Sequence, residues 1–204
     1  MSTERAVAAP GELVLYKLHG LGNDFLVVLD PAVLTGEQPI AAGVEHGPAL
    51  ARRLCDRHEG IGADGLIFGR RLSGTPAPAV LGFRLWNADG GGAEMSGNGI
   101  RCLAHAALDA GWVPEDEVFG VVTPAGRREV TVRRTSGVSA WGSVDMGPVK
   151  VRGEVERCNV GHGQLLVDVG NPHLVVLGPD PATVDLATLG PALEATDPAG
   201  LNVE

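Results

Sequence analysis

The residues best suited to chemistry lie in one glycine-rich segment, Asn87-Ala88-Asp89-Gly90-Gly91-Gly92-Ala93-Glu94-Met95-Ser96-Gly97-Asn98-Gly99. It runs from the end of a predicted strand into the start of a predicted helix. A helix start offers free backbone N–H groups and the positive end of the helix dipole, and glycines let a ligand approach the backbone. The segment therefore predicts an anion site. A carboxylate is favoured, because no Gly-Lys-Ser/Thr of a Walker loop follows and the segment fits no dinucleotide fingerprint.

Ser96 and the cysteines are the side chains whose protonation matters most. Serine is well suited to cap a helix. As a base, Ser96 would be poor, because a hydroxyl is far less acidic than a thiol and no base stands beside it in the sequence. Cys102 has apolar neighbours inside the predicted helix and is expected to pack. Because Cys55, Cys102 and Cys158 have no metal-ligand spacing, no metal site is predicted.

The helix behind Ser96 is the clearest element, predicted over 98–110. Its apolar residues Ile100, Leu103, Ala104, Ala107 and Leu108 recur at helical spacing, and Gly111 is suited to end it. One side of this helix must be buried. Other predicted elements are helices at 47–58, starting at Pro48 and stopping at Gly60, and near 185–195, and strands at 13–16, 25–29, 66–68 and 80–86, with more between 118 and 176. The 30 glycines and 14 prolines between short Val- and Leu-rich runs predict that sheet dominates.

An internal repeat predicts two related halves. Gly22-Asn23-Asp24-Phe25-Leu26-Val27-Val28-Leu29 recurs as Gly170-Asn171-Pro172-His173-Leu174-Val175-Val176-Leu177, and Pro48-Ala49-Leu50 has a looser echo in Pro191-Ala192-Leu193. No counterpart of the 98–110 helix follows before Glu204. Either a segment that a partner supplies is missing, which we favour, or the second domain is naturally shorter and closes on itself.

We therefore expect a flexible leader at 1–11, a first domain at 12–135 with the central helix 98–110, and a partial second domain at 136–204. The formal net charge of −9 argues against nucleic acid or an anionic membrane as a partner. The start of the chain lacks the apolar core of a signal peptide, and no apolar run reaches the ~20 residues of a membrane span. We expect a reduced, cytoplasmic protein.

Four stretches together resemble the diaminopimelate epimerase family in order and spacing: Lys17 to Phe25, Asp56 to Gly65, Asn87 to Cys102 and Gly170 to His173. The resemblance extends from about Leu13 to Glu204. It implies an α+β fold of two pseudo-symmetric domains, each of mostly antiparallel strands wrapped around a central helix, with the second incomplete in this chain. The substrate would lie in the cleft between the domains.

The resemblance implies a two-base inversion at an α-carbon without pyridoxal phosphate, metal or another cofactor. One cysteine thiolate removes the α-proton, and a thiol on the other face returns one. Ser96 stands at the position of the first cysteine, and the segment with the second cysteine and a Glu-Arg pair is absent from the 204 residues. The family's roles would make His173 a histidine beside the reacting centre, Gly97 and Asn98 the carboxylate contacts, and Asn23, Asn87, Asn171 and Asn202 the substrate-holding amides. Asn23 and Asn171 could instead be turn residues, and His173 could cap a strand end.

Three functions are consistent with these residues. The first is epimerisation of diaminopimelate or a similar amino acid in lysine biosynthesis, impaired in this chain by Ser96 and the absent second cysteine. The second is a catalytically dead amino-acid-binding or regulatory subunit. The third is a different isomerase of the same fold. In each case the partners expected are a small amino acid, a second chain or segment completing the second domain and, optionally, a further copy of the chain.

Overall fold

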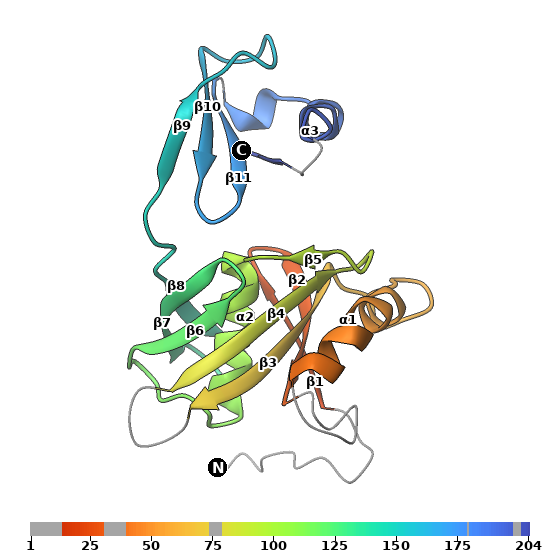
Figure 1. Cartoon of the computed structure of the whole chain (residues 1–204), viewed down its shortest axis with the longest axis vertical. Helices are drawn as coiled ribbons and strands as arrows, with labels where there is room; N and C mark the ends of the chain where they lie inside the picture. The colour runs from red at the N-terminus through yellow and green to blue at the C-terminus, as the bar shows by residue number, and fades with distance from the viewer. Residues whose placement is uncertain (1–13, 31–39, 74–78, 179, 198–200) are drawn as a thin grey trace. The chain divides into compact units, whose positions relative to one another are not determined.

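The computed structural model describes residues 14–30, 40–73, 79–178, 180–197 and 201–204 (Figure 1). The expected leader at 1–11 lies outside these residues. The chain divides into two compact units, unit 1 at Met1–Asp145 and unit 2 at Met146–Glu204. No helix of the described ranges is long and apolar enough to cross a membrane.

Unit 1 is built on one curled, mixed sheet. Its strands are β1 (Leu15–Gly20), β2 (Asn23–Leu29), β3 (Gly65–Ser73), β4 (Val80–Asn87), β5 (Gly92–Ala93), β6 (Phe119–Thr123), β7 (Gly126–Arg134) and β8 (Ala140–Val144). Their order is β1-β2-β3-β4-β6-β7-β8, with β5 paired to β4. The pairs β2·β3 and β4·β6 are parallel, and the other pairs are antiparallel. The sheet is therefore mostly antiparallel, as expected.

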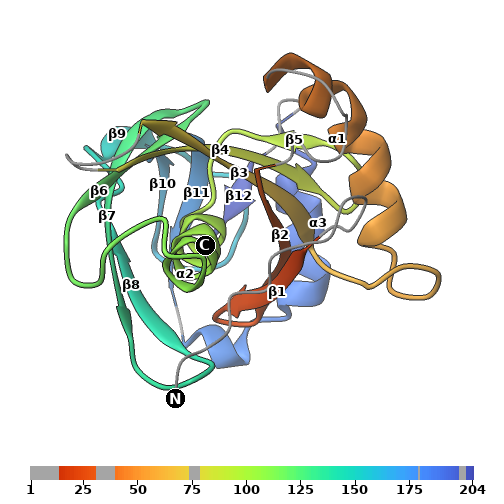
Figure 2. The same cartoon turned by 90° about the horizontal axis from the view of Figure 1, so that it is seen from below.

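Helix α2 (Gly97–Asp109) is the central helix that the sequence predicted at 98–110. It contacts β1, β2, β3, β4, β7 and β8, and Figure 2 shows it enclosed by the strands of this sheet. Ile100 and Leu103 are fully buried. Gly111, with a φ of 67°, ends the helix: its N–H donates to the Leu108 carbonyl at 3.0 Å, while Trp112 N–H donates to Ala107 at 2.8 Å. The buried helix and its glycine stop are confirmed.

Helix α1 (Ile40–Leu54) covers the opposite face of β2, β3 and β4. Leu26, Leu66 and Trp86 meet Ala51 in this layer. The prediction of a helix at 47–58 is wrong at both ends. Pro48 lies inside the helix rather than at its start, and the helix stops at Leu54 because Asp56 accepts hydrogen bonds from the N–H groups of the two residues after Arg57, both at 2.7 Å, which closes a tight turn.

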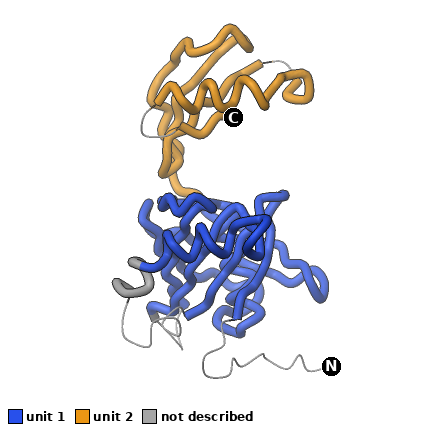
Figure 3. The backbone as a smooth tube through the Cα atoms, turned by 90° about the vertical axis from the view of Figure 1, so that its right-hand side faces the viewer, with its two compact units in different colours: residues 1–145 blue, residues 146–204 orange. Residues whose placement is uncertain are grey.

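Unit 2, drawn in orange in Figure 3, contains a smaller sheet with the order β12-β11-β10-β9. Its elements are β9 (Lys150–Glu154), β10 (Gly163–Asp168), β11 (Pro172–Leu177), the 3-10 turn η2 (Pro181–Thr183), α3 (Leu186–Glu194) and β12 (Asn202–Val203). Helix α3 packs on one face of the sheet, where Leu174, Leu193 and Leu201 form the core. The short helix predicted near 185–195 is confirmed.

The two units share one arrangement of elements. The antiparallel pair β1–β2 corresponds to β10–β11, and in each unit a helix then leads to a strand that pairs in parallel. The register agrees, because Leu26 pairs with Leu66 in unit 1 and the repeat-related Leu174 pairs with Val203 in unit 2. The sequence repeat is therefore a structural repeat.

The boundary between the units lies beyond the residue 135 expected from the sequence. Strand β8 pairs with β7 from Val130↔Val144 to Arg134↔Ala140. This hairpin also packs β8 against α2. Unit 1 consequently extends to Asp145.

Candidate functional site

Ser96 caps the N-terminus of α2. Its backbone is extended, with φ −149° and ψ 118°, and its Oγ accepts a hydrogen bond from the Gly99 N–H at 3.0 Å. The Ser96 carbonyl accepts from the Ile100 N–H at 2.8 Å. The interpretation of Ser96 as a helix cap is confirmed. The first N–H groups of a helix have no carbonyl partner within it. Accordingly, the N–H groups of Gly97 and Asn98 have no acceptor among the described residues.

The Asn98 carboxamide has a fixed direction. Its Oδ1 accepts a hydrogen bond from a guanidinium nitrogen of Arg101, one turn further along α2. Because guanidinium nitrogens can only donate, the contact assigns this atom as oxygen and turns the amide NH₂ of Asn98 the other way. Gly20 lies beside it, where an added Cβ would stand 3.2 Å from Oδ1. The helix start thus offers three fixed donors, two from the backbone and one from the side chain.

Asn23 and Asn87 lie at the same end of the sheet as this helix start. Phe25 pairs with Gly65, and Gly65 pairs with Asn87, so these residues share one face of the sheet. Asn23, two residues before Phe25, shares that face, which is the one turned toward α2. Asn23 also pairs with Gly20, the residue that touches Asn98. Unit 1 therefore gathers all of its predicted site residues around the start of α2.

Unit 2 gathers the other predicted residues at one end of β11. His173 Nε2 lies 3.0 Å from Asn171 Oδ1, and His173 Nδ1 lies 3.1 Å from Glu204 Oε1. Asn202 pairs with His173 in the sheet, and its side-chain amide donates to the Pro172 carbonyl at 3.1 Å. Both ring nitrogens of His173 thus face a side-chain oxygen of another residue.

The two fully buried thiols are unsuited to proton transfer. Cys102 and Cys55 are almost wholly buried, and burial raises the pKa of each thiol to about 11. The prediction that Cys102 packs in the core is confirmed. Among the residues that the structure describes, no three His, Cys, Asp or Glu side chains are grouped as metal ligands would be.

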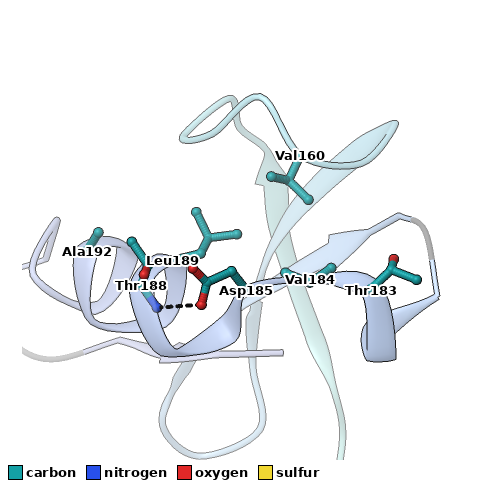
Figure 4. Close-up of a pocket in the computed structure, with 7 residues that line it drawn as sticks. All are labelled: Val160, Thr183, Val184, Asp185, Thr188, Leu189 and Ala192. Carbon is teal, nitrogen blue, oxygen red and sulfur yellow. Dashed lines mark hydrogen bonds between the residues drawn. The ribbon is translucent and has the colours of Figure 1, made fainter.

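Unit 2 also holds a cavity of about 370 Å³ beside α3 (Figure 4). Val160, Leu189 and Ala192 give it an apolar lining. Its one acidic residue, Asp185, accepts a hydrogen bond from the Thr188 N–H at 3.3 Å and so serves to cap α3. None of the predicted site residues lines this cavity.

Arg101 is the site residue that the sequence analysis missed. Its guanidinium sets the direction of Asn98, and its stem lies against Gly142 of β8, where an added Cβ would be 3.2 Å from Cγ. The spacing of Asn98 and Arg101, three residues apart on a helix, is a signal that could have found this contact.

Comparison with known proteins gives a consistent result. The sequence model of the family described as Diaminopimelate epimerase matches residues 15–151. A diaminopimelate epimerase of Mycolicibacterium paratuberculosis is 38% identical, with 92% of this chain and 68% of the relative covered. An O-ureido-serine racemase of Streptomyces lavendulae is 35% identical, with 92% of this chain and 65% of the relative covered. The chain thus spans about two thirds of the length of these relatives.

Solved structures show the same fold. A hydroxyproline epimerase from Agrobacterium vitis, crystallised with trans-4-hydroxy-L-proline, superposes with a TM-score of 0.65 at 19% identity, covering 90% of this chain and 59% of that one. A probable proline racemase from Agrobacterium radiobacter K84 gives 0.63 at 20% identity, with 91% and 59% covered. At such identities the likeness concerns the fold alone.

Proposed function

Because the chain belongs to the diaminopimelate epimerase family, we propose that it binds an α-amino acid at the start of α2 and that the reaction of this site is inversion at the α-carbon. The observation that carries the proposal is the capped helix start, where the Gly97 and Asn98 N–H groups and the Asn98 amide are fixed donors. An anion at a helix N-terminus gains about 0.3–1 kcal/mol, and up to about 2 kcal/mol where it is partly buried. The α-carboxylate of an amino acid is the natural occupant.

The remaining amides would hold the rest of the substrate. Asn23 and Asn87 stand beside the helix start in unit 1, while Asn171 and Asn202 flank His173 in unit 2. We assign His173 a place beside the reacting carbon, with its ring oriented by Glu204 and Asn171. Removal of an α-proton leaves negative charge that spreads onto the carboxylate, so donors fixed at that carboxylate stabilise the product of this step. This chemistry requires neither pyridoxal phosphate nor a metal.

Ser96 occupies the position that we assign to the first base. Its hydroxyl already accepts the Gly99 N–H, and a serine hydroxyl is far less acidic than a thiol. The buried thiols of Cys55 and Cys102 have raised pKa values and cannot replace it. We therefore propose that the chain with Ser96 is inactive or strongly impaired as an epimerase.

Diaminopimelate, in the cytoplasmic synthesis of lysine, is the substrate we favour, because two relatives that are each 38% identical to this chain carry that name. The O-ureido-serine racemase of Streptomyces lavendulae, with 35% identity, favours a second candidate: inversion of another α-amino acid by the same site. Turnover of a panel of α-amino acids distinguishes the two.

Unit 2 is proposed to be completed by a further segment or a second chain. In unit 1, Phe25 and Val27 are 2% and 0% exposed because α2 covers their face of the sheet. The equivalent face of unit 2 carries Val151 and Leu177, which are 63% and 45% exposed. A helix equivalent to α2 would bury this face. The intact mass of natively purified material tests the proposal. A longer chain would indicate a completing segment, an added different mass a second chain, and a doubled mass a further copy of this chain.

Restoring the base tests the catalytic proposal. The chain would be fused to the carboxy-terminal third of the Mycolicibacterium paratuberculosis relative, and α-proton exchange of diaminopimelate followed by NMR in deuterated water. We expect exchange with Ser96→Cys and little or none with Ser96 or with Ser96→Ala as the matched control. Absence of exchange by the Ser96→Cys fusion with several diamino acids would refute the proposal.

A binding or regulatory role is a third candidate function, and the capping of α2 by Ser96 favours it. In that case the donors at the helix start bind the amino acid and no proton is removed. Calorimetry that detects tight binding by the native material, together with no exchange by the fusions that carry Ser96 or Ser96→Cys, would support this role over catalysis.

A further inference from the structure

Four charged residues join two separate sequence motifs beside the start of β2. One guanidinium nitrogen of Arg57 lies 2.6 Å from Asp24 Oδ1 and 2.8 Å from Asp64 Oδ1. On the other side, Lys17 Nζ lies 3.2 Å from Asp24 Oδ2. Lys17 and Asp24 come from the motif around Asn23, and Arg57 and Asp64 come from the motif between α1 and β3, to which no role has yet been assigned.

The two aspartates also bind each other's backbone. The Asp24 N–H donates to Asp64 Oδ2 at 2.9 Å, and the Asp64 N–H lies 3.2 Å from Asp24 Oδ1 and 2.9 Å from the Asp24 carbonyl. Lys17 in addition donates to the carbonyl of Gly62. The first residues of β2 and the segment entering β3 are thereby held together by both backbone and side-chain contacts.

The element held by these contacts is the turn that presents Asn23. Leu21 and Gly22 form a two-residue turn with φ values of 55° and 92°. Leu21 is strained there, because side chains other than that of Gly seldom adopt positive φ. The Asn23 carboxamide is hydrogen-bonded to no described residue, so its direction depends on the backbone beneath it. Asp24, the next residue, points to the opposite face of the sheet and anchors that backbone.

These four charged residues hold the backbone in position and contribute little to the free energy of unfolding. Arg57 is 54% exposed, and exposed ion pairs contribute about 1 kcal/mol or less. Asp24 is only 17% exposed, and its contact with Arg57 holds the pKa of that carboxyl well below its usual range. Without Arg57, Asp24 would face the like charge of Asp64, and Lys17 would be the one described residue still paired with it.

We infer that Arg57 is a positioning residue of the amino-acid site: by joining Asp24 to Asp64, it fixes the backbone from which Asn23 reaches the start of α2. The nature of the ligand rests on the proposed function, but the coupling from Arg57 to Asn23 is a property of the free protein. It assigns a role to the motif at 56–65, which is to hold the turn at 20–23 in place.

The experiment compares Arg57→Met with Arg53→Met, which removes an exposed arginine of α1 whose side chain forms no hydrogen bond or ion pair with a described residue. NMR of the full chain follows the Asn23 side-chain amide signals between about pH 7 and about pH 4, the range in which an ordinary carboxyl begins to titrate. We expect constant signals for the unsubstituted chain and for Arg53→Met. For Arg57→Met we expect shifted signals that change further with acidification, as Asp24 gains a proton. A purely structural role would lower the unfolding temperature without this titration.

Calorimetry with meso-diaminopimelate then separates this inference from the proposed function. If the unsubstituted chain binds, Arg57→Met should weaken binding about tenfold, the loss expected for one well-placed hydrogen bond. If the unsubstituted chain does not bind, the proposed function fails, whereas the Asn23 signals still decide the role of Arg57. Should Arg57→Met not fold, Asp64→Asn keeps an acceptor for the Asp24 N–H and removes the ion pair between Arg57 and Asp64, so that Arg57 no longer joins the two aspartates through charge. Asn23 signals that match those of the unsubstituted chain in the folded variant would overturn the inference.

Discussion

The Ser96→Cys variant of the chain as it stands measures how strongly the start of α2 favours an anion, through the pKa of the new thiol. A thiol there would occupy the place of an oxygen that caps α2, next to the free N–H groups of Gly97 and Asn98. An ordinary thiol has a pKa of about 8.5. The helix N-terminus favours an anion by about 0.3 to 2 kcal/mol, and one pKa unit corresponds to about 1.4 kcal/mol, so the new thiol should have a pKa between about 7 and about 8.3. The rate of alkylation by iodoacetamide as a function of pH measures this value.

The other cysteines give an internal control for that measurement. Cys55 and Cys102 have pKa values raised to about 11 by burial and should stay unreactive. Cys158 is half-buried and would be replaced by serine beforehand. A pKa of the new thiol at or above about 8.5 would show that the helix start does not favour an anion, and the carboxylate site proposed there would lose its basis. Loss of the serine cap should also lower the free energy of unfolding by about 1 kcal/mol.

Three further predictions concern the framework that holds the site. Leu103→Ala should lower the free energy of unfolding of unit 1 by about 2–5 kcal/mol in urea titration, because this fully buried side chain of α2 would leave a cavity; a cost under 1 kcal/mol would contradict the packing of α2 within the sheet. Gln164→Met should destabilise unit 2 by about 1–3 kcal/mol, measured by hydrogen exchange of β10 and β11. The Gln164 side chain accepts from the Cys158 N–H at 3.3 Å and donates to the Cys158 carbonyl at 2.6 Å, and methionine would leave both groups without these partners. Burial lowers the pKa of His105, so on acidification the unfolded chain binds a proton at this residue before the folded chain does, and unit 1 should lose stability as the pH falls below about 6.5. In the His105→Gln variant this part of the pH dependence of stability should vanish. An unchanged pH dependence would show that another group causes it.

Local patterns in the sequence were enough to predict the elements that carry the candidate site. The apolar spacing of Ile100 and Leu103 placed α2 to within one residue, and the serine before the helix is its cap. The repeat of Gly-Asn before two strands predicted the shared arrangement of the two units. These features depend on residues a few positions apart, whose spacing is fixed by the geometry of a single helix or strand. Helix α1 was misplaced because Pro48 was interpreted as a helix start, although a packed helix can contain a proline.

The sequence by itself determined the family, the buried helix and the residue types at the start of α2. Only the tertiary structure decided which distant residues meet. Asp24, Arg57 and Asp64 come together because β2 and β3 pair in parallel with Phe25 opposite Gly65, and no local spacing encodes that register. Likewise, the curl of the sheet brings Gly20 of β1 beside Asn98 of α2. Strand register and sheet curvature are set by the packing of the whole core around α2, which is why these contacts could not be found along the chain.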